Sequence, residues 1–180
     1  MDTVSILQLV ILVVLLFLSA FFSSAETALT TVNKIKMKSM AEEGDKRAQC
    51  VLKVTDDSAK MLSAILIGNN VVNLSASSLA TTLAIRLLGS VGAGVATGLL
   101  TLLILIFGEI SPKTLATLNA TKISLSYAKI IWGLMVILTP VIFLINKLSL
   151  VFLRLLRVDP NQNEGAITEE ELRIMVDASH

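Results

Sequence analysis

The chain has 180 residues, of which 54% are hydrophobic and 16% are charged, and its mean hydropathy is +0.78. Soluble domains carry about 25% charged residues, so this composition excludes an ordinary soluble domain and indicates an all-α integral membrane protein. The formal net charge is +1 and the basic residues are dispersed around apolar runs, which excludes the basic patch that a nucleic-acid partner requires.

The first apolar segment starts at Val4 and continues in helix-compatible residues to Val32. It is longer than the roughly 20 residues that cross the hydrocarbon core of a bilayer. A cleaved signal peptide is the alternative, but the segment follows Asp2, has no basic residues before it and exceeds the usual length of a signal's apolar region. We therefore interpret 4–32 as a retained first span.

The next segment, 33–57, alternates charged and apolar residues, which predicts two short amphipathic helices on the membrane surface, broken near Gly44. Asp57 or Ser58 is expected to cap a second long helix, because a short polar side chain accepts a backbone N–H of the first turn. The second span then covers about 59–88. A glycine-rich turn, Gly89 to Gly94, leads into a third span of about 91–118.

The last apolar stretch, 122–156, is interrupted at Pro140. It either crosses the membrane as a fourth span or folds back as a Pro-kinked re-entrant or interfacial helical pair. Basic residues are enriched on cytoplasmic flanks, and here they cluster after the first span and at both ends of the last stretch. This distribution favours three spans, a juxtamembrane belt, an N-terminus outside and a cytoplasmic C-terminus, in a multi-pass protein of the plasma or inner membrane.

The character of the chain changes after Val158, so we predict a transmembrane domain at 1–158 and a polar linker that begins at 159. Thr168 and Glu171 have the spacing of a capping box, which predicts the start of a helix. We interpret 159–180 as the linker and the beginning of a truncated cytosolic region.

Polar residues inside membrane spans are costly, and their positions are a guide to function. In the first span Ser19, Ser23 and Glu26 recur at helical spacing. In the second, Asn69 and Asn73 share a stripe near the expected bilayer centre, continued by Ser77 and flanked by Asn70.

The third cluster is Gly108, Glu109 and Pro112, directly after an uncharged run. Pro112 clashes with the carbonyl four residues earlier, which is that of Gly108. The freed carbonyl and the Glu109 carboxylate are hard oxygens, and together with serine and asparagine oxygens they suit Mg²⁺, Ca²⁺ or Na⁺ better than zinc or copper.

Structural interpretations of the same residues stay open. Ser19 and Ser23 are also typical of helix packing, and Asn69 and Asn73 of hydrogen bonds between helices. Glu109 has the spacing to pair with Lys113, and Glu26 to pair with Lys34 or with solvent.

Three segments resemble the signature segments of the CNNM/CorC transmembrane domain: LSAFFSSAETAL at 18–29, ILIGNNVVN at 65–73 and LIFGEISPKTLA at 105–116. The tail EEELRIMVDASH at 169–180 resembles the helix that leads into the family's paired CBS domains. The resemblance implies a homodimer in the lipid bilayer that transports Mg²⁺, commonly described as efflux coupled to Na⁺, and regulation by ATP only through the CBS domains. It also implies the Mg²⁺ ligands: Ser19, Ser23, Asn69, Asn73, Gly108 and Glu109.

Two functional hypotheses follow. The first is a Mg²⁺ transporter that binds the cation between its spans. The second is a Mg²⁺-binding sensor or scaffold that acts through the cytosolic region. An enzyme is disfavoured, because the sequence has no nucleophile paired with a base and no phosphate-binding glycine loop.

Overall fold

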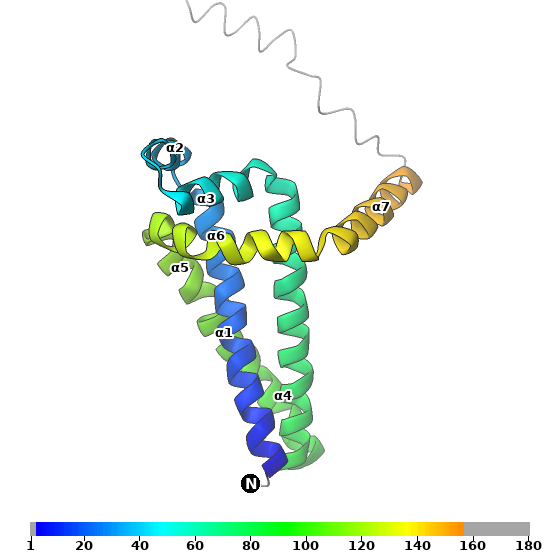
Figure 1. Cartoon of the computed structure of the whole chain (residues 1–180). Helices are drawn as coiled ribbons and strands as arrows, with labels where there is room; N and C mark the ends of the chain where they lie inside the picture. Colours follow the sequence, from blue (N-terminus) through cyan, green and yellow to red (C-terminus); the bar gives the residue numbers. More distant parts are fainter. Residues whose placement is uncertain (1–2, 157–180) are drawn as a thin grey trace, which may run out of the picture. The chain divides into compact units, whose positions relative to one another are not determined.

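The computed structural model describes residues 3–156, and all regular elements within this range are helical (Figure 1). The predicted linker and cytosolic start at 159–180 lie outside the described residues. The helices are α1 (Thr3–Thr31), α2 (Lys34–Glu42), α3 (Lys46–Asp56), α4 (Ser58–Leu103), the π-helix η1 (Ile104–Ile110), α5 (Ser111–Leu118), α6 (Ala120–Ile137) and α7 (Thr139–Leu155).

Four helical stretches in this range are long and apolar enough to cross a membrane: Thr3–Thr31, Ser58–Ser90, Gly92–Leu118 and Ala120–Ile137. The first three coincide with the segments predicted as spans. The fourth is α6, so length and composition also permit the crossing that the charge distribution disfavours. The three-span arrangement therefore stays a prediction.

Local capping signals confirm three predicted helix starts. The Asn33 side chain accepts a hydrogen bond from the Lys36 N–H at 3.0 Å, and Asp45 accepts one from the Arg47 N–H at 2.8 Å, with Gly44 in the turn between α2 and α3. The Asp57 carboxylate accepts from the Lys60 N–H at 3.0 Å and so caps α4. Each cap satisfies an N–H that has no partner within its own helix.

The predicted turn between the second and third spans is confined to a single residue. Gly89 has φ +72°, a left-handed conformation that glycine adopts without steric cost, and it divides α4 into two helical parts. Gly92 and Gly94 are helical, so the predicted turn was too wide.

The predicted kink at Pro140 is in fact a helix end: α6 stops at Ile137, and Pro140 lies in the first turn of α7, where proline is tolerated.

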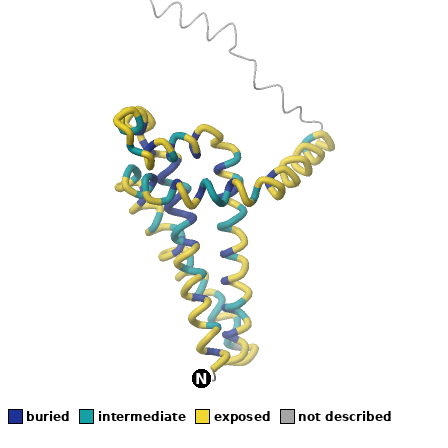
Figure 2. The backbone as a smooth tube through the Cα atoms, in the orientation of Figure 1, coloured by how far each residue is buried: buried dark blue, intermediate teal, exposed yellow. Residues whose placement is uncertain are grey.

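Close packing of α1 on α4 gives the first 138 residues their core, and the two helices lie side by side over much of their length (Figure 1). Leu12 packs against Ala76 and Ala80. A Cβ added at Gly68 would lie 2.5 Å from Cζ of Phe22, so a larger residue there would displace the phenyl ring. Away from these contacts many positions of the spans are exposed (Figure 2), and a large share of them are apolar residues, as expected for surfaces that face lipid.

In contrast to α1 and α4, α6 runs across both of them in Figure 1 and packs on α3 and α1. The Lys53 ammonium lies 3.9 Å from the centroid of the Trp132 ring, and the Phe21 and Tyr127 rings lie 4.6 Å apart. The amphipathic α3 is therefore attached to α6 by a cation–π contact, which is favourable over a tryptophan face.

Replacing Lys53 by Met is expected to lower the free energy of unfolding by about 0.5–1 kcal/mol, the value of a cation–π contact at an exposed site. Trp132 is the chain's only tryptophan, so its fluorescence during denaturation in detergent measures the effect directly. Lys46→Met, on the exposed part of the same helix, is the matched control. Equal changes in the two variants would contradict the contribution of the contact.

Candidate cation-binding site

The site begins with an irregular helix next to a proline. Pro112 has no N–H and occupies the first turn of α5, and the preceding residues 104–110 form the π-helix η1. The Ser111 N–H donates to the Ile106 carbonyl, five residues earlier, as a π-helix requires. The predicted interruption of the helix is thus accommodated by a wider turn, a form of helix that is frequent at functional sites.

The Gly108 carbonyl, which the proline argument predicted to be free of the helix ladder, faces α1. It accepts a long hydrogen bond of 3.5 Å from the Ser19 hydroxyl, and both residues are buried. A Cβ added at Gly108 would lie 2.8 Å from Ser19 Oγ and 3.3 Å from Ser19 Cβ. Glycine at this position therefore lets the backbone of η1 approach the serine face of α1 directly.

The Glu109 carboxylate connects η1 to α4. Its Oε1 accepts a hydrogen bond of 3.3 Å from Asn73 Nδ2, and the same amide nitrogen lies 3.5 Å from Asn69 Oδ1 one turn earlier. Glu109, Asn69 and Asn73 are all half-buried, whereas Asn70 is exposed. The stripe of Asn69 and Asn73 is thus the part of α4 that meets the acid.

Two oxygens at this junction are buried without a hydrogen-bond partner in the described part of the chain. They are Ser23 Oγ, on the turn of α1 that follows Ser19, and Asn73 Oδ1. A buried polar atom without a partner costs about 1–3 kcal/mol. Oxygens of this kind are chemically fitted to a hard cation, which would restore the missing interaction.

Together, these contacts connect five of the six predicted site residues, and the sixth, Ser23, lies one helical turn beyond Ser19 on α1. Ser19 joins α1 to Gly108, Glu109 joins η1 to Asn73, and Phe22 lies against Gly68 beside Asn69. The region contains one carboxylate among neutral oxygens, and residues 3–156 contain no cluster of three or more His, Cys, Asp or Glu side chains that could hold a metal ion. This donor set matches the preference of Mg²⁺ for oxygen and differs from that of zinc.

Two alternative ion pairs considered from spacing are wrong. Spacing allowed a Glu109–Lys113 pair and a Glu26–Lys34 pair. Instead, Lys113 Nζ lies 3.4 Å from Glu26 Oε2 on α1, so Lys113 and Glu26 pair with each other. Glu109 instead meets the Asn73 amide. Spacing alone missed the pairing because Glu26 and Lys113 lie on different helices.

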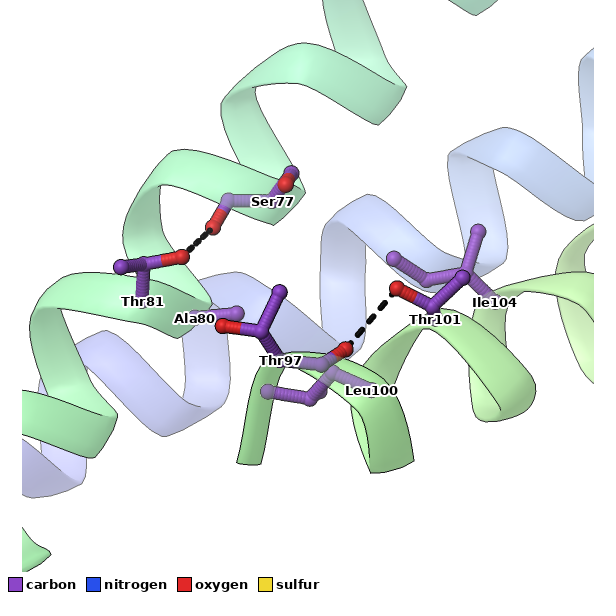
Figure 3. A pocket seen from close by; sticks show the side chains of 7 residues that line it. All are labelled: Ser77, Ala80, Thr81, Thr97, Leu100, Thr101 and Ile104. Atoms are coloured by element: carbon purple, nitrogen blue, oxygen red, sulfur yellow. Dashed lines mark hydrogen bonds between the residues drawn. The ribbon is translucent and has the colours of Figure 1, made fainter. Parts of the chain in front are cut away.

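The asparagine stripe continues through Ser77, as predicted, to Thr81. Ser77 and Thr81 on α4 face Thr97 and Thr101 on its second part, and they line a small cavity of about 10 Å³, enough for about one water molecule (Figure 3). Thr81 donates to the Ser77 carbonyl at 2.9 Å and Thr101 to the Thr97 carbonyl at 2.8 Å. The i, i+4 spacing from Asn73 to Thr81 was the signal in the sequence, but their meeting with Thr97 and Thr101 depends on the reversal at Gly89.

Comparisons with known proteins agree with this architecture. Residues 10–180 match the family described as the Cyclin M transmembrane N-terminal domain (CNNM). The chain is 38% identical over 177 residues to a UPF0053 protein of Haemophilus influenzae, covering 98% of this chain and 42% of that protein. It is 34% identical over 163 residues to the UPF0053 inner membrane protein YfjD of Escherichia coli, covering 90% of this chain and 38% of that protein.

A DUF21 domain-containing chloroplastic protein of Arabidopsis thaliana is 37% identical over 169 residues, which is 94% of this chain and 26% of the relative. The chain thus spans less than half the length of these relatives. The match covers the helices that carry the site, together with residues beyond the described range. The chain is a multi-pass membrane domain, and it belongs to the Cyclin M (CNNM) transmembrane domain family.

Proposed function

We propose that this domain transports Mg²⁺ across a cell membrane, with the ion bound between α1, α4 and η1. Its ligands are drawn from the oxygens of Ser19, Ser23, Asn69, Asn73, the Gly108 carbonyl and Glu109. The observation that carries the proposal is the presence of two unpartnered buried oxygens: Asn73 Oδ1, whose amide meets Glu109, and Ser23 Oγ, one helical turn beyond Ser19.

The electrostatics support a divalent cation held with part of its water shell. Mg²⁺ gives up water reluctantly and is usually bound by one or two carboxylates together with waters. Glu109 supplies the charge, while the serine and asparagine oxygens replace lost waters. An irregular helix is tolerated at membrane depth where it is buried in protein, and η1 packs on α1 and α4.

The arrangement in the membrane is part of the proposal. The lysine-rich α2 and α3 lie on the cytoplasmic side, the N-terminus lies outside, and α6 belongs to a belt at the interface. Two copies of the chain form the transport unit, Na⁺ is the coupling ion for efflux, and ATP acts only through CBS domains of the whole protein.

The test is ion flux by purified protein in liposomes that contain a Mg²⁺-sensitive dye, with and without an opposing Na⁺ gradient. Transport predicts flux above that of protein-free liposomes, and coupling predicts that the Na⁺ gradient changes its rate. Isothermal titration of the same preparation with Mg²⁺ measures binding. Binding without flux would overturn the transport proposal and favour a sensor or scaffold.

A further inference from the structure

The Glu26–Lys113 ion pair lies next to the candidate cation site. Glu26 is on α1, just under one turn beyond Ser23, and Lys113 is on α5, about one turn beyond Glu109. Their charged atoms are 3.4 Å apart, and the side chains of Lys113 and Glu26 are 46% and 42% exposed. The pair therefore joins the same two chain segments as the Ser19–Gly108 contact, but where water has access.

The direction from the site to the pair is fixed by two contacts. Ser19 touches Gly108, and further along both segments Glu26 touches Lys113, so α1 and the η1–α5 segment run in parallel. Seven residues of α1 separate the two contacts, about 10 Å along the helix. α1 continues past Glu26 into the lysine-bearing α2, so the pair lies on the side of the site that faces the basic helices.

The charges have opposite effects on a cation that passes this point. The Lys113 ammonium repels it, whereas the Glu26 carboxylate attracts it but is already occupied by Lys113. A half-exposed ion pair is weak, and exchange of its partner costs little. The Glu26 carboxylate is therefore a cation ligand that is occupied by the ammonium of Lys113, which competes with a passing ion.

From this geometry we propose that Glu26 is an inner cation ligand on the path between the candidate site and the cytosol. Lys113 acts as a gate on this path, because its ammonium occupies the Glu26 carboxylate. A divalent cation displaces the ammonium from Glu26 when it passes. This inference rests on the proposed function for its direction of traffic, but the ion pair and its position do not depend on it.

Two single variants distinguish a gate from a structural ion pair. Lys113→Met frees Glu26 and is expected to raise Mg²⁺ flux about two- to fivefold, the factor that a pair of this exposure contributes to an equilibrium. Glu26→Gln removes the ligand and leaves the ammonium unneutralised, so flux is expected to fall by a similar factor. A structural pair is broken equally by both changes, so flux that falls in both variants, or that Lys113→Met leaves unchanged, overturns the gate.

A second measurement does not require transport. Cys50 is the chain's only cysteine, so Cys50→Ser with Ser23→Cys places a single thiol at a wholly buried position of the site. A small cationic thiol reagent applied from the cytosolic side is expected to modify it about two- to fivefold faster when Lys113→Met is added. Ser39→Cys, exposed on α2, controls for general reactivity and is expected to be unaffected.

The two experiments fail separately. Wild-type protein that moves no Mg²⁺ overturns the proposed function but leaves the accessibility measurement valid. Equal modification of Ser23→Cys with and without Lys113→Met overturns the gate alone. Lys113→Gln is a second neutral variant, and size-exclusion profiles and melting temperatures identify any variant that does not fold.

Discussion

Replacing Glu109 by Gln is expected to weaken Mg²⁺ binding on the order of 100-fold, because removing one partner of a desolvated charge pair costs about 2–5 kcal/mol. Gln is nearly isosteric, so the side chain still reaches Asn73 and the packing of η1 on α4 is kept. The variant removes the negative charge next to Asn73, whose Oδ1 is buried without a hydrogen-bond partner among the described residues. Flux in liposomes is expected to fall to the level of protein-free vesicles.

The matched control for this variant is Glu42→Gln, which removes the same charge from an exposed position on α2. It is expected to retain wild-type affinity and flux, since screening weakens exposed charges that are far from a site. Binding is measured by titration calorimetry and flux with the entrapped dye. A Glu109→Gln protein that binds Mg²⁺ with wild-type affinity would exclude the carboxylate as a ligand.

Replacing Gly108 by Ala is expected to abolish most transport by separating η1 from α1. The added Cβ meets Ser19 Oγ at 2.8 Å and Ser19 Cβ at 3.3 Å, so one of the helices has to move. Overpacking of this kind costs about 1–3 kcal/mol, against up to ~1 kcal/mol that Ala gains over Gly in a helix. We expect a lower melting temperature. We also expect a loss of flux on the order of tenfold, the factor that corresponds to about 1.4 kcal/mol of cation-binding free energy, because the Gly108 carbonyl is displaced from the site.

A double variant separates packing from cation binding. Adding Ser19→Ala removes the hydroxyl at 2.8 Å but keeps the Cβ at 3.3 Å, so the melting temperature is expected to recover in large part. Flux is expected to stay low, because the serine oxygen is also lost from the site. Recovery of both properties would show that Ser19 serves packing only, the structural interpretation that its sequence position left open.

The parts of the fold that could be predicted from the sequence depend on local signals. Long apolar runs define the helices, and Asp57 caps α4 because its carboxylate reaches an N–H only three residues away. Pro112 identifies the helix irregularity, because its ring and missing N–H affect the preceding turn. Helical spacing indicated the serine and asparagine stripes, and the family resemblance implied the six ligands, of which the contacts connect Ser19 to Gly108 and Glu109 to Asn73 and Asn69.

Only the tertiary structure decided the partners of the charged groups. Spacing allowed Glu109 to face Lys113, but that relation assumes an unbroken α-helix, and the wider turn of η1 changes which faces the two residues present. Glu109 meets Asn73 and Lys113 meets Glu26 because packing fixes the rotation of α1, α4 and η1 about their axes. Helical periodicity determines which side chains share a face, whereas contacts between residues far apart in the chain determine which faces meet.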